Sequence, residues 1–74
     1  MKELEILSKN LKSLRKEYGY TQSDIAEALG ITYQSYQAYE LGITTPTLKN
    51  FIKIAEFFDV SLDFLIGKKR NLNK

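Results

Sequence analysis

The sequence predicts an all-helical domain of five short helices. Leucine, isoleucine, phenylalanine and tyrosine recur every three or four residues, which is the spacing that places side chains on one face of a helix. Glycines and hydroxyl residues, which commonly end and begin helices, separate these periodic segments. The chain has 74 residues, of which 43% are apolar, so we expect one domain with one small core.

The first predicted helix occupies most of the first 18 residues. Glutamates at its start and lysines near its end suit the helix dipole, and Gly19 is expected to end it. Its inward face is predicted to consist of five residues at three- or four-residue spacing: Leu4, Leu7, Leu11, Leu14 and Tyr18.

Two short helices follow, and each is expected to begin at a threonine. Thr21 is suited to cap the second helix, with Asp24 at the capping-box position three residues later. Gly30 fits a left-handed turn after that helix, and Thr32 is suited to cap the third. Gly42 then stands where the third helix should end.

The second and third helices have the spacing of a helix-turn-helix. Ala26 lies four residues before Gly30, and two helices that cross closely need a small side chain at their contact. A tight turn at the glycine and a threonine cap on each helix complete the pattern. Together these features predict a helix-turn-helix over residues 22–39.

A loop and a fourth helix are predicted next. Residues 43–46 are expected to form the loop, and Thr47 to cap the helix. The inward stripe of this helix is predicted to be Leu48, Phe51, Ile54, Ala55 and Phe58.

The last predicted element is a short fifth helix. Ser61 is expected to cap it, residues 62–66 to form it, and Gly67 to close it. We therefore place the domain at residues 1–67 and expect residues 68–74 to form a basic polar tail.

Composition excludes several classes of function. The chain has no cysteine and no histidine, so we expect no disulfide, no thiolate or imidazole metal site and no histidine general base. We predict that the protein is not an enzyme, needs no cofactor or metal and has no small-molecule substrate. No apolar run approaches the roughly 20 residues of a membrane span, and the first residues lack the apolar stretch of a secretory signal. The expectation is a cytoplasmic protein without a membrane partner.

The helix-turn-helix segment and its flanks resemble the Cro and phage-repressor family of helix-turn-helix proteins. The resemblance covers about residues 5–67. It implies a five-helix, lambda-repressor-like DNA-binding domain whose second helix crosses the phosphate backbone and whose third helix enters the major groove. The matching pattern, in chain order, is Leu11-x-x-Leu14-Arg15, Thr21-Gln22-x-x-Ile25-Ala26-x-x-Leu29-Gly30-Ile31-Thr32, Tyr39-Glu40-x-Gly42, Pro46-x-Leu48 and Val60-Ser61-Leu62-Asp63.

The resemblance also implies roles for individual residues. Arg15 and Glu40 would form a structural ion pair between the first and third helices, and Leu62 and Phe64 would lie at a homodimer interface. Base edges would be contacted by Tyr33, Gln34, Gln37 and Ala38. Phosphates would be contacted by Gln22, Thr32, Ser35, Thr44 and Thr45.

Side-chain chemistry agrees with base contacts from the third helix. Glutamine forms a bidentate pair with adenine, and alanine or tyrosine contacts the thymine methyl, so we expect positions with A·T pairs to be favoured. Other interpretations stay open: Gln34 and Gln37 also suit a solvated helix face, and Tyr33 suits a base, a phosphate or a protein. Tyr36 and Tyr39 are expected in the core, with the Tyr36 hydroxyl reaching water or a partner at its edge.

The charge distribution leaves two functions open. Net charge is +2, but residues 19–48 contain no lysine or arginine. Because phosphate neutralisation usually supplies much of the affinity for DNA, we expect modest affinity per protomer. We predict a sequence-specific, repressor-like regulator of transcription that binds double-stranded DNA as a homodimer. The alternative is a protein-binding member of the same fold, an antirepressor, repressor modulator or antitoxin, whose tyrosine-rich third helix binds a repressor or a toxin.

Overall fold

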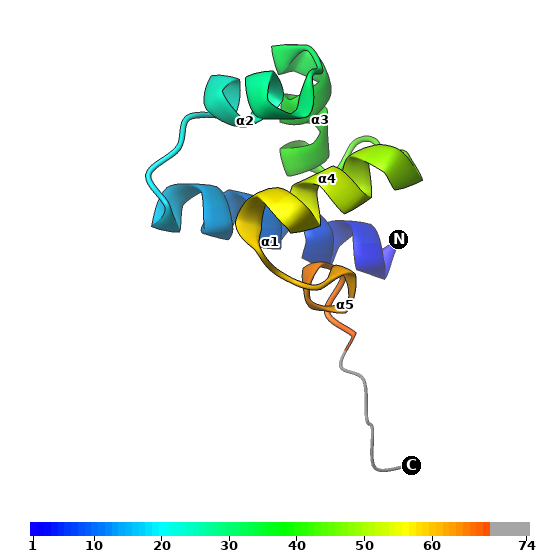
Figure 1. Ribbon diagram of the computed structural model, residues 1–74. Coiled ribbons are helices and arrows are strands. Elements are labelled where there is room, and N and C mark those ends of the chain that lie inside the picture. The colour runs from blue at the N-terminus through cyan, green and yellow to red at the C-terminus, as the bar shows by residue number, and fades with distance from the viewer. Residues whose placement is uncertain (69–74) are drawn as a thin grey trace.

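The computed structural model describes residues 1–68 of the chain. Within that range there is no strand, so the prediction of an all-helical domain of five helices is confirmed. No helix in the same range is both long enough and apolar enough to cross a membrane. The predicted basic tail lies outside the described residues, apart from Lys68. The helices are α1 (Lys2–Glu17), α2 (Gln22–Leu29), α3 (Tyr33–Leu41), α4 (Leu48–Phe58) and α5 (Leu62–Leu65), shown in Figure 1.

The other helices are arranged around α1. In Figure 1, α2 and α3 lie on one side of α1, and α5 lies on the opposite side. α1 contacts both α3 and α5, whereas α4 contacts α2 and α5. The helix-turn-helix and the last helix therefore occupy different faces of the domain, with α1 between them.

Hydroxyl side chains cap four of the five helices, as predicted. Thr21, Thr32, Thr47 and Ser61 each accept a hydrogen bond from the backbone N–H three residues later. At the start of α2, the Asp24 carboxylate also accepts from the backbone N–H of Thr21 at 2.9 Å, which completes the capping box. Each cap is worth about 1 kcal/mol, so the helix starts follow from local sequence.

The ends of α2, α3 and α4 all use a residue in the left-handed region. Gly30 and Gly42 both have φ of +72°, as predicted. Asp59 ends α4 with φ of +56°, where no glycine marked the position in the sequence. Aspartate tolerates this conformation better than most residues because its short polar side chain can hydrogen-bond locally.

The core consists of apolar side chains from all five helices. Tyr36 and Tyr39 are both buried in it, as the sequence predicted, and their rings meet edge to face with centroids 6.2 Å apart. The buried side chains that form this core are Leu7, Leu11, Leu14, Ile25, Ala26, Leu29, Tyr36, Tyr39, Ile54, Ala55, Phe58 and Leu65.

Three expectations about buried side chains were wrong. Tyr18, expected on the inward face of the first helix, is 49% exposed because it follows the last residue of α1, although its ring packs edge to face against Phe58. Leu48 is 71% exposed instead of facing inward, because it is the first residue of α4 and that turn projects beyond the core. Pro46, which stands two residues before Leu48 in the preceding loop, is buried.

The Tyr36 hydroxyl, expected at the edge of the core, is fully buried, and within residues 1–68 it makes no hydrogen bond of standard geometry, although Glu40 lies close to it. Burial raises the pKa of Tyr36 well above its ordinary value.

Candidate nucleic-acid interface

The turn between α2 and α3 has the geometry of a tight helix-turn-helix. The backbone N–H of Ile31 donates to the oxygen of Ala26 at 3.0 Å, and that of Gly30 donates to the oxygen of Glu27 at 3.1 Å. A Cβ added at Gly30 would meet nothing within 4 Å, so glycine is needed there for its positive φ and not for space. Ala26 is buried, which agrees with its expected role at the contact between the helices.

One side of α3 presents the residues expected to contact base edges. Tyr33 is 42% exposed and Gln34 is also exposed, while Gln37 and Ala38 are half-buried. Tyr33 and Gln37 are four residues apart, and so are Gln34 and Ala38. The two pairs therefore lie side by side along one face of the helix. The structure therefore brings them to one surface, and their contact with bases stays a prediction.

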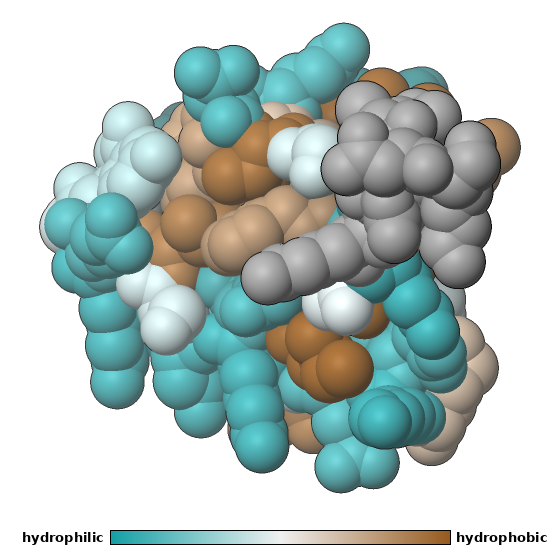
Figure 2. Space-filling model, turned by 90° about the horizontal axis from the view of Figure 1, so that it is seen from below, coloured by the Kyte–Doolittle hydropathy of each residue, from teal (hydrophilic) through white to brown (hydrophobic). Residues whose placement is uncertain are grey.

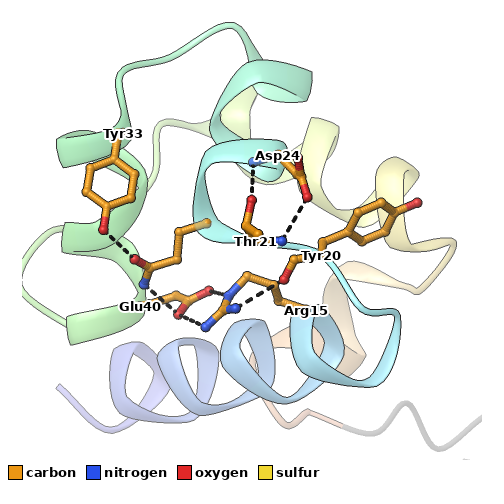
Figure 3. A network of polar contacts seen from close by, with 7 residues as sticks. Arg15, Tyr20, Thr21, Asp24, Tyr33 and Glu40 are labelled. Atoms are coloured by element: carbon orange, nitrogen blue, oxygen red, sulfur yellow. Dashed lines mark hydrogen bonds and ion pairs between the residues drawn. The ribbon is translucent and has the colours of Figure 1, made fainter.

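A chain of side-chain hydrogen bonds runs from α1 to the end of α3, then to the start of α2, and back to the start of α3 (Figure 3). Arg15 donates from Nε and Nη2 to the two carboxylate oxygens of Glu40, at 2.6 and 3.1 Å. Gln22 Nε2 donates to Glu40 Oε1 at 3.0 Å, and the Tyr33 hydroxyl donates to Gln22 Oε1 at 3.0 Å. We call this set of four side chains the polar junction.

Glu40 is the centre of the polar junction and is only 4% exposed. Burial by itself would raise the pKa of Glu40, but hydrogen bonding, chiefly from the Arg15 guanidinium, outweighs it and holds the pKa below its ordinary value. Arg15 also donates from Nη1 to the backbone oxygen of Tyr20 at 3.1 Å. The junction therefore joins α1, the segment before α2 and both ends of α3.

The junction changes how two of the expected DNA contacts are understood. Gln22 and Tyr33 were assigned separately, one to a phosphate and the other to a base edge. In the structure they bind each other, and Gln22 uses both ends of its amide group within the junction. Nothing in the sequence indicated this coupling, because the two residues are eleven positions apart and meet only when α2 and α3 pack.

The other expected phosphate contacts lie at the start of α3 and in the loop after it. Thr32 Oγ1 accepts from the backbone N–H of Ser35 at 3.1 Å and donates to the Ser35 hydroxyl at 2.9 Å. Thr44 and Thr45 are exposed in the loop that follows Gly42. The N-terminal end of α3 carries the positive end of its helix dipole, which favours a phosphate there.

Exposed apolar side chains stand on both sides of these threonines in the sequence. Leu41 is 61% exposed, Ile43 is 68% exposed and Leu48 is exposed beyond them. We call these three residues the apolar edge. Isolated exposed leucines are ordinary, but three apolar side chains close together in sequence, beside a segment without cations, suit contact with another macromolecule.

The expected dimer face lies on α5. Phe64 is 50% exposed, whereas Leu62 is half-buried and packs against the core. Figure 2 views the molecule from below relative to Figure 1, the side on which α5 lies, and shows apolar side chains gathered between polar ones. Asn10 holds α5 in place, since its Nδ2 donates to the backbone oxygens of Phe64 and Leu65 at 3.1 and 3.0 Å. Sequence reasoning missed Asn10, which no motif marks.

Comparison with known proteins agrees with this geometry. A helix-turn-helix family model matches residues 11–65 of the chain. The uncharacterised HTH-type transcriptional regulator YqaE of Bacillus subtilis is 46% identical over 66 residues, covering 89% of this chain and 57% of that protein. The cryptic phage CTXphi transcriptional repressor RstR of Vibrio cholerae is 37% identical over 62 residues, covering 84% of this chain and 55% of that protein. This chain therefore spans just over half the length of these two curated relatives.

A solved structure supports the same likeness in three dimensions. The N-terminal DNA-binding domain of SinR from Bacillus subtilis superposes on this chain with a TM-score of 0.78 and 26% sequence identity. The match covers 90% of this chain and 99% of that domain. The helices of the present chain thus have the order and arrangement of that domain.

Proposed function

We propose that this chain, which belongs to the helix-turn-helix family, binds duplex DNA in a sequence-dependent way and regulates transcription. The family match confirms the resemblance to Cro and phage repressors that the sequence indicated. The observation that carries the proposal is the exposed face of α3, which presents two glutamines and a tyrosine beside a capped helix start.

In the proposed complex, α3 lies in the major groove. Gln34 forms a bidentate pair with an adenine, and Gln37 contacts a neighbouring base edge. Ala38 and Tyr33 contact thymine methyl groups or adjacent base edges. Because α3 carries no lysine or arginine, we expect it to prefer operators with A·T pairs at the contacted positions.

Phosphate contacts position α3 in this proposal. Thr32 and Ser35 bind phosphates at the start of α3, and Thr44 and Thr45 bind a phosphate near its end. Gln22 reaches a phosphate from the start of α2 with its remaining amide hydrogen, or by giving up a bond within the polar junction. These neutral donors fix orientation but supply less long-range attraction than cations do.

We further propose that the protein acts as a homodimer through α5. Phe64 and Leu62 supply the apolar contact, and a single protomer of this size would contact few base pairs. Two copies of α3 would then enter successive major grooves about 34 Å apart on a pseudo-palindromic operator. Occlusion of a promoter or recruitment at it would follow from where that operator lies.

Selection of duplexes from a random pool tests the DNA-binding proposal. The expected result is a palindromic motif with A·T pairs at specific positions. Gln34→Ala should then weaken binding by about 1–3 kcal/mol and relax preference at one base position. Glu56→Gln, an exposed change on α4, is the matched control and should leave binding unchanged. An unchanged base preference for Gln34→Ala would remove Gln34 from the contacting residues.

Sedimentation tests the dimer. Phe64→Glu should shift the protein towards monomer, because it places a charge in the apolar contact. Leu41→Glu introduces the same charge at an exposed apolar residue on another face and should leave the dimer intact. A dimer that survives Phe64→Glu would place the interface elsewhere.

The apolar edge favours a second candidate function. Leu41 and Ile43 are more than half exposed, and together with Tyr33 they suit a protein interface, which commonly uses aromatic and aliphatic anchors. On this alternative the chain is an antirepressor, repressor modulator or antitoxin. The random pool would then yield no enriched duplex, and a captured repressor or toxin would be released by Ile43→Glu.

A further inference from the structure

We propose that a lysine-lined groove on α1 is a second site for the phosphate backbone of duplex DNA, outside the helix-turn-helix. The groove has a volume of about 330 Å³. This inference rests on the proposed function, because it concerns the same DNA ligand. We call the site the basic groove, and its lining residues are Ser8, Lys9, Lys12, Ser13, Lys16 and Glu40.

None of the three lysines of the basic groove forms an ion pair within residues 1–68. Lys12 lies three residues after Lys9 and four residues before Lys16, so the three ammonium groups share one side of α1. Neither of the ion pairs found among residues 1–68 includes any of them, since these join Arg15 to Glu40 and Lys68 to Glu3. Like charges at these spacings destabilise a helix, and an anionic ligand would relieve the repulsion.

The only acidic residue of the groove does not neutralise it. Both carboxylate oxygens of Glu40 already accept hydrogen bonds, from Arg15 and Gln22. The Glu40 charge is therefore balanced by Arg15, which does not line the groove. The three lysines remain available to bind an anion from solution.

The basic groove adjoins the end of α3 and the loop after it. A Cβ added at Gly42 would lie 3.5 Å from the Ser8 hydroxyl oxygen, so this end of the groove is in contact with the turn that leads to Thr44 and Thr45. Glu40, in the last turn of α3, forms one wall. A phosphate backbone that contacts the two threonines would continue past the lysines.

Duplex DNA is the ligand that these observations favour. The helix-turn-helix and its following loop, residues 19–48, contain no lysine or arginine. Binding to a polyanion requires cations, and the basic groove provides three at the edge of that uncharged surface. An acidic protein would be attracted to the three lysines as well, but it would give no role to the exposed amide of Gln34 on α3.

The test compares three variants of the full chain on the duplex enriched from the random pool and on an unrelated duplex of equal length. In the first, Lys9→Gln, Lys12→Gln and Lys16→Gln are combined. The second replaces the same lysines by arginine and so keeps the charge. The third, Lys2→Gln, removes one exposed lysine of α1 that lies outside the groove.

The expected result is a change in salt dependence without a change in base preference. Each phosphate that a lysine no longer neutralises should lower the slope of log affinity against log salt by roughly 0.9. If each of the three lysines neutralises one phosphate, the wild-type chain should lose roughly 40-fold more affinity than the glutamine variant between about 50 and 200 mM salt. The arginine variant should keep the wild-type slope, and Lys2→Gln should not change it.

Failure of this inference differs from failure of the proposed function. If the glutamine variant keeps the wild-type slope while Gln34→Ala still weakens binding, the basic groove is not a phosphate site and the proposed function stands. If the wild-type chain enriches no duplex, both fail. Unfolding in urea guards against a misfolded variant, since removing mutual repulsion on α1 should not lower stability.

Discussion

α1 contacts α3 on one side and α5 on the other, and the two contacts rest on different chemistry. Towards α3, Arg15 makes two charge-assisted hydrogen bonds to a buried carboxylate. Towards α5, Asn10 donates from one neutral amide to two backbone oxygens. The charged contact has a fixed, forked geometry, whereas the amide contact covers the open end of a short helix.

The difference follows what each helix has to do. In the proposed complex α3 presents side chains to DNA, so its orientation relative to α2 and α1 matters, and a bidentate ion pair joins it to α1. α5 has only four residues, Leu62–Leu65, and cannot satisfy its own backbone oxygens. A side-chain amide from α1 supplies the missing donors.

Removing the buried carboxylate should have the largest effect. Glu40→Ala is expected to lower the free energy of unfolding by about 3 kcal/mol, because the Arg15 side chain is only 15% exposed and would be left without its partner. Gln22 would be deprived of its acceptor at the same time. Urea unfolding at neutral pH measures this change.

A double variant separates charge burial from packing. Arg15→Met combined with Glu40→Leu removes both charges and should recover most of the stability that Glu40→Ala removes. Affinity for the selected duplex should nevertheless stay low in the double variant, because the polar junction no longer orients α3. Recovery of both stability and affinity would show that the ion pair does not position the helix.

Protonating Glu40 should have a smaller effect than removing it. The pKa of Glu40 in the folded chain lies below its ordinary value of 4.5, so the ionised carboxylate favours folding. This contribution is fully present above about pH 4.5 and is lost as the pH falls through the lowered pKa. Glu40→Gln should flatten the stability profile in that acidic range. A profile that Glu40→Gln leaves unchanged would assign acid sensitivity to other carboxylates.

Asn10→Ala tests the contact with α5. The substitution removes two hydrogen bonds to backbone oxygens, so we expect the free energy of unfolding to fall by about 1–2 kcal/mol. Hydrogen exchange should accelerate in α5 more than in α3. Ser13→Ala, at an exposed position of the same helix, is the control. Equal acceleration in α3 would show that the two contacts of α1 are not independent.

The smallest expected effect has the opposite sign. Tyr36→Phe removes a buried hydroxyl that makes no hydrogen bond of standard geometry in the described part of the chain, so stability should stay the same or rise by up to about 1 kcal/mol. Thermal unfolding of Tyr36→Phe beside Tyr39→Phe provides the contrast, because the Tyr39 hydroxyl accepts from Asn50 Nδ2 at 3.1 Å. A loss of stability in Tyr36→Phe would mean that its hydroxyl takes part in the polar junction.

Much of the fold was predictable because its signals are local. Thr21 and Asp24 form the predicted capping box, and Gly30 adopts the predicted left-handed turn. Each of these depends on residues within one turn of the chain. The left-handed end of α4 was missed because Asp59 occupies a position where the pattern calls for glycine.

The candidate site was predictable only in part. Placing Gln34 and Tyr33 on an exposed face of α3 required only the helix boundaries and the resemblance to phage repressors. That Tyr33 binds Gln22, and Gln22 binds Glu40, depends on how three helices meet. Such contacts between residues far apart in the chain leave no periodic signal in one sequence.

Local sequence was thus sufficient for the five helices, the hydroxyl caps at the start of four of them and most of each apolar face, because short-range hydrogen bonds and helical spacing decide these. Tertiary packing decided which polar groups were buried together and which apolar ones were left exposed. It buried the Tyr36 hydroxyl, turned Leu48 outward and set Lys9, Lys12 and Lys16 beside the end of α3. The physical reason is that burial and charge proximity are properties of the packed helices together, whereas a cap or a turn is a property of a few adjacent residues.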